Sequence, residues 1–328
     1  MTTASTQPTT ARRANAAHRA KRFLSDNGAL VGLVALCLGL AIATPVFLSP
    51  INLVNVGIQA AVVAILGFGM TFVIVAAGID LSVGSIAALS SMSAAFLASQ
   101  SGLPGGLALV AGLLVGALVG AINGLANAFL RLPSFIATLA MLSIARGLTL
   151  VISDGRPIAT PPEISALGAS IGPVPAPILL FVVAGLIAAL ILNRTTWGRA
   201  MYAVGGNTEA SRLSGIPVRA VQVLVFVLSG TFAALAGMVL AGRLNSAQPQ
   251  AASGYELDAI AAVVIGGASL AGGVGRVTGT LIGALLLAVI RNGLNILNVS
   301  SFWQQVVIGL VIAIAVALDV LRRDDSSH

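Results

Sequence analysis

The chain has 328 residues, of which 57% are apolar and only 8% are charged, and its mean hydropathy is +1.02. Soluble domains carry about 25% charged residues, so this composition excludes an ordinary soluble protein. The formal net charge is +7. The basic residues lie between or outside the apolar runs, so we expect no nucleic-acid-binding surface.

The residue inventory excludes several kinds of chemistry. Cys37 is the single cysteine, so there is no disulfide framework and no cysteine-based metal site. The two histidines, His18 and His328, lie near the ends of the chain. Lys21 is the only lysine and lies in no glycine-rich loop, so the chain cannot build a Walker A motif. We therefore expect no catalytic residue, no metal site and no cofactor bound directly by this chain.

Long apolar runs of about twenty residues predict an all-α polytopic membrane protein. The predicted spans are residues 28–48, 53–77, 83–99, 106–130, 135–152, 176–193, 220–241, 257–270, 277–297 and 302–321. The third and eighth are short, so we expect them to be partial, broken or re-entrant helices. One transmembrane domain, 28–321, thus lies between a basic tail, 1–27, and a short tail, 322–328.

The distribution of Lys and Arg predicts the orientation. With the N-terminus inside, thirteen basic residues are cytoplasmic, and only Arg156 and Arg243 lie in outer segments. The cytoplasmic set comprises the five basic residues of the tail and Arg131, Arg194, Arg199, Arg212, Arg219, Arg276, Arg322 and Arg323. The first span is too long for the apolar region of a signal peptide. We expect both termini, and the loop 194–219, to be cytoplasmic.

An aspartate and a serine stand before the third span, in Gly78-Ile79-Asp80-Leu81-Ser82. Asp80 suits a helix N-terminus, where it can accept free backbone N–H groups, and Ser82 can serve as the cap itself. The alternative is that the motif shapes the inner gate of a transport pathway.

The sequence repeats itself at residues 116–135, "GALVGAINGLANAFLRLPSF", and 283–302, "GALLLAVIRNGLNILNVSSF". A second pair is "SIAAL" at 85–89 and "AIAAV" at 259–263. The two copies run in opposite directions, which predicts two inverted-topology halves with a pathway between them. The alternative is a likeness of composition alone. Glycines also recur every fourth residue, which lets another helix approach closely: Gly112, Gly116, Gly120 and Gly124 in one copy, Gly275, Gly279 and Gly283 in the other.

Amide side chains occur in both copies of the repeat. Asn123 and Asn127 share one helix face, and Asn292 and Asn295 occupy the matching part of the second copy. Amides inside a membrane either join helices or line a wet cavity, where they can bind sugar hydroxyls. The predicted pathway residues are Asp80, Ser82, Asn123, Asn127, Asp258, Asn292 and Asn295.

Two arginines fall within or near the ends of spans, Arg146 and Arg291. A charge near mid-membrane costs at least ~2.5 kcal/mol, so each must pair, snorkel or face a wet cavity. Glu256 and Asp258 are candidate acidic partners.

The segment 153–177 is too polar to span a membrane and holds six prolines. It is either a docking surface for an extracytoplasmic partner or a plain connector.

The stretch "GGNTEASRLSGIPVRA", residues 205–220, lies between two apolar runs. Asn207 or Thr208 can cap a short helix, with Glu209 in its first turn and Arg212 near its end. Gly215 and Pro217 then stop it. We therefore expect a short solvent-facing helix in the cytoplasmic loop.

Three further motifs carry a family resemblance. They are "GIDLSVGS" at 78–85, "RLNSAQP" at 243–249 and "GYELDAIAAVVIGGASLAGGVGRVTGTLIGALLL" at 254–287. With the loop at 205–220, they resemble the ribose-type monosaccharide permeases of bacterial ABC importers nearly word for word. The resemblance covers roughly residues 30–320.

This resemblance implies a permease subunit that is not itself an enzyme, in the bacterial cytoplasmic membrane. It implies a homodimer, two cytoplasmic ATP-binding subunits that hold ATP and Mg²⁺, and an extracytoplasmic sugar-binding protein, for ribose or a similar sugar. The loop would dock in a groove of the ATP-binding subunit through Gly205, Gly206, Asn207, Glu209, Ser211, Arg212 and Gly215. The alternative is an ATP-independent secondary carrier or channel, since inverted repeats occur there too.

Overall fold

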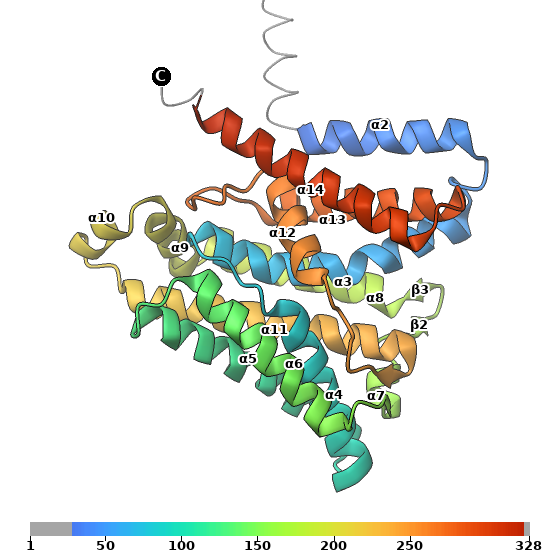
Figure 1. Ribbon diagram of the computed structural model, residues 1–328, viewed down its shortest axis with the longest axis horizontal. Coiled ribbons are helices and arrows are strands. Elements are labelled where there is room, and N and C mark those ends of the chain that lie inside the picture. Colours follow the sequence, from blue (N-terminus) through green and yellow to red (C-terminus); the bar gives the residue numbers. More distant parts are fainter. Residues whose placement is uncertain (1–27, 325–328) are drawn as a thin grey trace, which may run out of the picture.

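The computed structural model describes residues 28–324, and these form a bundle of helices with four two-residue strands (Figure 1). The predicted tail 1–27 lies outside the described residues, as do residues 325–328 of the second tail. Seven helices are long and apolar enough to cross a membrane. The predicted all-α membrane protein is confirmed at this level.

A helix lies at each of the ten predicted spans. These helices are α2 (Gly28–Ala43), α3 (Pro50–Val75), α4 (Val83–Ser101), α5 (Gly105–Ala128), α6 (Ser134–Ser153), α8 (Ala176–Arg194), α11 (Val218–Leu244), α12 (Tyr255–Ile265), α13 (Val277–Ile296) and α14 (Ser301–Asp324). The prediction of a short third span is wrong, because α4 has 19 residues and ends only at Gly102, where φ is +63°. The eighth is short: α12 has 11 residues, about 16 Å of helix, against a hydrocarbon core of about 30 Å.

The remaining elements mark the two ends of the bundle (Figure 1). At one end, which we call the α10 end, lie α9 (Thr196–Gly206) and α10 (Thr208–Leu213). At the opposite end, the hairpin end, lie α7 (Pro162–Ser165), β1 (Ile158–Ala159), β2 (Ser170–Ile171), β3 (Val174–Pro175) and β4 (Ser246–Ala247). The antiparallel pairs β1–β4 and β2–β3 close this end, and β1–β4 ties the α6–α8 loop to the segment after α11.

Helix α3 is the centre of the core. Its residues from Ala60 to Val75 are all buried, and it packs against α8, α11, α12 and α13. Phe72 meets Phe232 of α11 edge to face, with ring centroids 5.8 Å apart. A helical segment that is almost entirely apolar is one enclosed by protein or lipid, and the part of α3 from Ala60 to Val75 is enclosed by protein.

The recurring glycines let helices cross closely, as predicted. On α5 they face α11 and α4, and a Cβ on Gly120 would overlap the carbonyl oxygen of Phe226. On α13, a Cβ on Gly279 or Gly283 would overlap the backbone of α12 or of the turn that follows it, at Gly266 or Ala262. In a membrane, such small residues allow the backbone contact that holds helices together.

Gly120→Ala is therefore expected to destabilise the protein by roughly 1–3 kcal/mol, the usual cost of overpacking a close contact. Thermal unfolding of the detergent-solubilised protein measures this effect. Gly106→Ala on the same helix is the matched control, because no heavy atom lies within 4 Å of its Cβ position. Equal midpoints for the two variants would contradict the close α5–α11 crossing.

Candidate functional site

The loop between α8 and α11 folds as two short helices, α9 and α10. The side chain of Asn207 caps α10 by accepting a hydrogen bond from the N–H of Ala210 at 2.9 Å, which confirms the predicted capped helix. The chain leaves α10 at Gly215, where φ is +79°. Glu209 and Arg212 form an exposed ion pair at 2.5 Å. The hydrogen bond from Arg212 lowers the pKa of Glu209, so this pair keeps its charges well below neutral pH.

The surface of α10 is open to solvent. Leu213 is 79% exposed at its end, whereas Ser211 is buried against the protein. The two glycines before α10 differ: a Cβ on Gly205 would overlap the carbonyl oxygen of Val75, but nothing lies within 4 Å of the Cβ position of Gly206. Gly205 thus serves internal packing, and Gly206 is exposed with room for a side chain.

The short helices pack against α3, α8 and α11, and two hydrogen bonds lie at this contact with the core. The N–H of Gly273 donates to the carbonyl oxygen of Val75, at the end of α3, and both lie against Gly205. The hydroxyl of Tyr202 on α9 donates to the carbonyl oxygen of Gly275 at 2.7 Å. Helix α9, directly before α10, therefore contacts both the end of α3 and the loop that precedes α13.

Asp80 lies in a fully buried polar cluster. It accepts hydrogen bonds from the hydroxyls of Ser82 at 2.6 Å and Ser229 at 2.8 Å, and Ser82 in turn accepts from the amide of Asn123. Ser82 is the N-cap residue of α4, but its hydroxyl donates to Asp80 and makes no capping bond. Asp80 accepts a hydrogen bond from the backbone N–H of Ser82 at 3.0 Å, as predicted for an aspartate at this helix start. The cluster joins the start of α4 to α5 and α11; its part in a pathway stays a prediction.

The other predicted amides also meet protein partners. Asn127 donates to the carbonyl oxygen of Leu132 and closes the α5–α6 turn. Asn292 and Asn52 exchange two amide hydrogen bonds, of 2.8 and 3.0 Å, which join α13 to α3. Sequence reasoning missed Asn52 and Ser229, although each is an isolated polar residue within an apolar helix. Pathway roles for Asn127 and Asn292 stay predictions.

The two arginines of the spans find different partners. Arg291 forms an ion pair with Asp258 at 2.6 Å, so one of its two candidate partners is confirmed. The Glu256 carboxylate instead accepts from the N–H of Gly254. Arg146 donates to the carbonyl oxygens of Pro249 and Ala251, in the segment that leads into α12.

Comparison with known proteins decides the family. Residues 52–316 match the profile of the family described as branched-chain amino acid transport system / permease component. The chain belongs to this permease family.

The ribose import permease protein RbsC of Bacillus subtilis is 48% identical over 302 residues, 89% of this chain and 92% of that protein. The ribose import permease protein RbsC of Escherichia coli K12 is 43% identical over 306 residues, which are 91% of this chain and 95% of that protein. The L-arabinose transport system permease protein AraH of the same strain is 40% identical over 300 residues (91% of each). No solved structure matches the chain.

Membership has direct consequences. The permease is a multi-pass membrane subunit of an ABC importer and not an enzyme, and a separate ATPase chain hydrolyses ATP. A permease of this kind works with an ATP-binding subunit and a substrate-binding protein.

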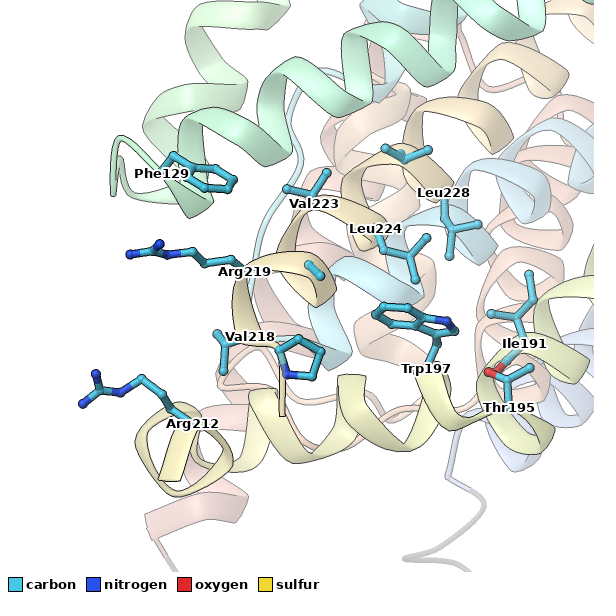
Figure 2. Close-up of a pocket in the computed structure, with 13 residues that line it drawn as sticks. Phe129, Ile191, Thr195, Trp197, Arg212, Val218, Arg219, Val223, Leu224 and Leu228 are labelled. Atoms are coloured by element: carbon cyan, nitrogen blue, oxygen red, sulfur yellow. The ribbon is translucent and has the colours of Figure 1, made fainter. Parts of the chain in front are cut away.

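Beside α10 the permease has an apolar groove of about 1010 Å³. Figure 2 shows Ile191 of α8, Trp197 of α9 and Leu224 of α11 converging on it, while Arg212 and Arg219 point away. The guanidinium of Arg219 lies 5.4 Å from the ring centroid of Phe129. Such a lining suits apolar neighbours and offers few partners to sugar hydroxyls, so the groove is no sugar site.

Proposed function

We propose that this permease carries ribose or a similar monosaccharide across the bacterial cytoplasmic membrane. The observation that carries the proposal is the 40–48% identity, over about nine tenths of the chain, to permeases named for ribose and arabinose. The family description mentions branched-chain amino acids, but it covers the family as a whole. Full-length relatives at this identity are the better guide to the substrate class.

The proposed topology has ten crossings or partial crossings, with the α10 end and both termini in the cytoplasm. Basic residues support this orientation, because several lie in the short helices or beside helix ends at the α10 end: Arg131, Arg194, Arg199, Arg212 and Arg219.

The proposed inverted halves are α3–α6 and α11–α14. Matching contacts support them: α5 packs on α4 and on α11 of the other half, while α13 packs on α12 and on α3 of the other half. The starts of α4 and α12 also adjoin, where Gly84 lies against the carbonyl oxygen of Ala252. In transporters built this way, movement of one half against the other alternates access to the pathway.

In the proposed mechanism, α10 docks in the ATP-binding subunit, with Gly205, Gly206 and Gly215 shaping the loop and Asn207 capping it. ATP and Mg²⁺ bind the partner, which pushes α10 and, through Val75 and Gly273, the end of α3. Two permease copies form a homodimer that receives sugar from the binding protein. The exposed polar surface of α10 supports this contact.

Co-purification and ATPase assays test the function. The ATP-binding subunit of the importer is expected to co-purify with the permease, and ribose-loaded binding protein should raise its ATP hydrolysis. A permease that binds no ATP-binding subunit, yet transports sugar, would favour the secondary carrier or channel.

A further inference from the structure

A small polar cavity lies among five helices, α3, α11, α12, α13 and α14. Its volume is about 160 Å³, and its polar lining consists of Gln59, Arg243, Tyr255, Arg291, Asn295 and Gln304. A larger cavity of about 610 Å³ between α12 and α14 shares three of these residues and adds Asp258. The two cavities share a wall formed by Tyr255, Arg291 and Gln304, and we call these adjoining cavities the recess. The larger cavity is within the usual size of ligand sites, about 300–1000 Å³.

Two polar side chains enter this recess without a protein partner. Among the residues whose side chains the structure describes, 28–314 and 316–317, neither the amide of Gln59 nor the guanidinium of Arg243 forms a hydrogen bond, although both residues are partly buried. The only fully buried side-chain polar atom without a partner in that range is the hydroxyl of Ser90. The polar atoms of Gln59 and Arg243 therefore reach open space, and that space is the recess that they line.

The position of these groups makes the missing partners significant. Gln59 lies nine residues inside α3, about 14 Å along the helix from its start. A polar group at membrane depth is costly unless a polar partner or water meets it. An amide at this depth that lines a recess together with a guanidinium from the end of α11 is typical of a binding site for a polar ligand.

The neighbouring polar groups are already held in place. Arg291 is fixed by its ion pair with Asp258 and lies 5.7 Å from the ring centroid of Tyr255. The amide of Gln304 donates to the side chain of Asn295 at 2.7 Å. These contacts hold part of the polar lining of the recess in place, and such preorganisation favours binding.

We propose that this recess is a binding site for one monosaccharide in each permease copy. This proposal rests on the proposed function and identifies where in the permease the sugar binds. Gln59 offers both a donor and an acceptor, Arg243 offers donors, and the carboxylate of Asp258 offers acceptors. Hydroxyl groups of a neutral sugar require both kinds of partner. The recess lies towards the hairpin end, where the binding protein would release the sugar.

Gln59→Leu tests this binding site, because leucine has a similar size but cannot form hydrogen bonds with a sugar. In the complete importer reconstituted in liposomes, ribose uptake should fall at least tenfold, while stimulation of the ATPase by ribose-loaded binding protein is retained. Gln100→Leu, on the exposed end of α4, is the matched control and should transport as the wild type does. Wild-type uptake by Gln59→Leu would overturn the proposed binding site. A wild-type importer that takes up neither ribose nor arabinose would instead contradict the proposed function.

A labelling experiment tests the same site without relying on turnover. Cys37 is the single cysteine, so Cys37→Ser provides a background for Gln59→Cys and Gln100→Cys. A water-soluble methanethiosulfonate reagent should label both, and ribose supplied with the binding protein should slow labelling of Gln59→Cys at least threefold and leave Gln100→Cys unchanged. Failure of the reagent or of ribose to act on Gln59→Cys would overturn the proposal.

Discussion

Gly206→Trp is expected to leave the permease folded and membrane-inserted but to abolish ATP-driven transport. The Cβ position of Gly206 has no neighbour within 4 Å, so the permease itself has room for a side chain there. A docked ATP-binding subunit would meet the indole at the contact surface. Disturbing a central interface position costs about 2–4 kcal/mol, or roughly 30-fold to 1000-fold in affinity. Co-purification of the ATP-binding subunit and sugar uptake measure the effect.

Two other substitutions serve as controls for this result. Gly206→Ala adds only a methyl group and should transport nearly normally. Gly205→Ala should behave differently, because its Cβ would overlap the carbonyl oxygen of Val75 and disturb the attachment of α9 to α3. It should lower the thermal stability of the isolated permease, which Gly206→Trp should leave unchanged. Normal uptake by Gly206→Trp would contradict the coupling role of this surface.

Arg291→Leu is expected to produce the largest loss of stability among single substitutions at the ion pair. It leaves the carboxylate of Asp258, only 5% exposed, without its cation. Removing one member of a buried pair typically costs ~3–5 kcal/mol. Arg291 itself is 28% exposed, so the lower end of that range is expected. Thermal unfolding of the solubilised permease measures the loss.

The double substitution Asp258→Asn with Arg291→Gln is the control for the charge. It removes both charges and keeps amide groups that can hydrogen-bond, so most of the lost stability should return. If the double variant is as unstable as Arg291→Leu, the charge pair does not explain the effect.

Much of the helical framework could be predicted from the sequence. Hydropathy is a local property, so the apolar runs located all ten helices to within a few residues. The cap of α10 was also predictable, because Asn207 and Gly215 act on the backbone beside them. The length of α4 was not predictable from hydropathy. Its last turn contains the polar residues Gln100 and Ser101, so the apolar run ends before the helix does.

The partners of polar side chains could not be predicted, because they depend on which helices cross. Asn123 and Asn127 share a helix face, yet one bonds to Ser82 within the core and the other closes a local turn. Asn292 pairs with Asn52, which is 240 residues away in the chain. Gln59 is a polar residue within a predicted span, but the sequence does not show that its side chain lines a cavity enclosed by five helices.

ATP-dependent accumulation of labelled ribose in liposomes tests the central claim most directly. The permease would be reconstituted with its ATP-binding subunit inside and its sugar-binding protein outside, with and without enclosed ATP. We predict that ribose accumulates above its outside concentration only when ATP is present. Accumulation without ATP, or simple equilibration that ATP does not change, would contradict the account of this chain as the permease of an ATP-driven sugar importer.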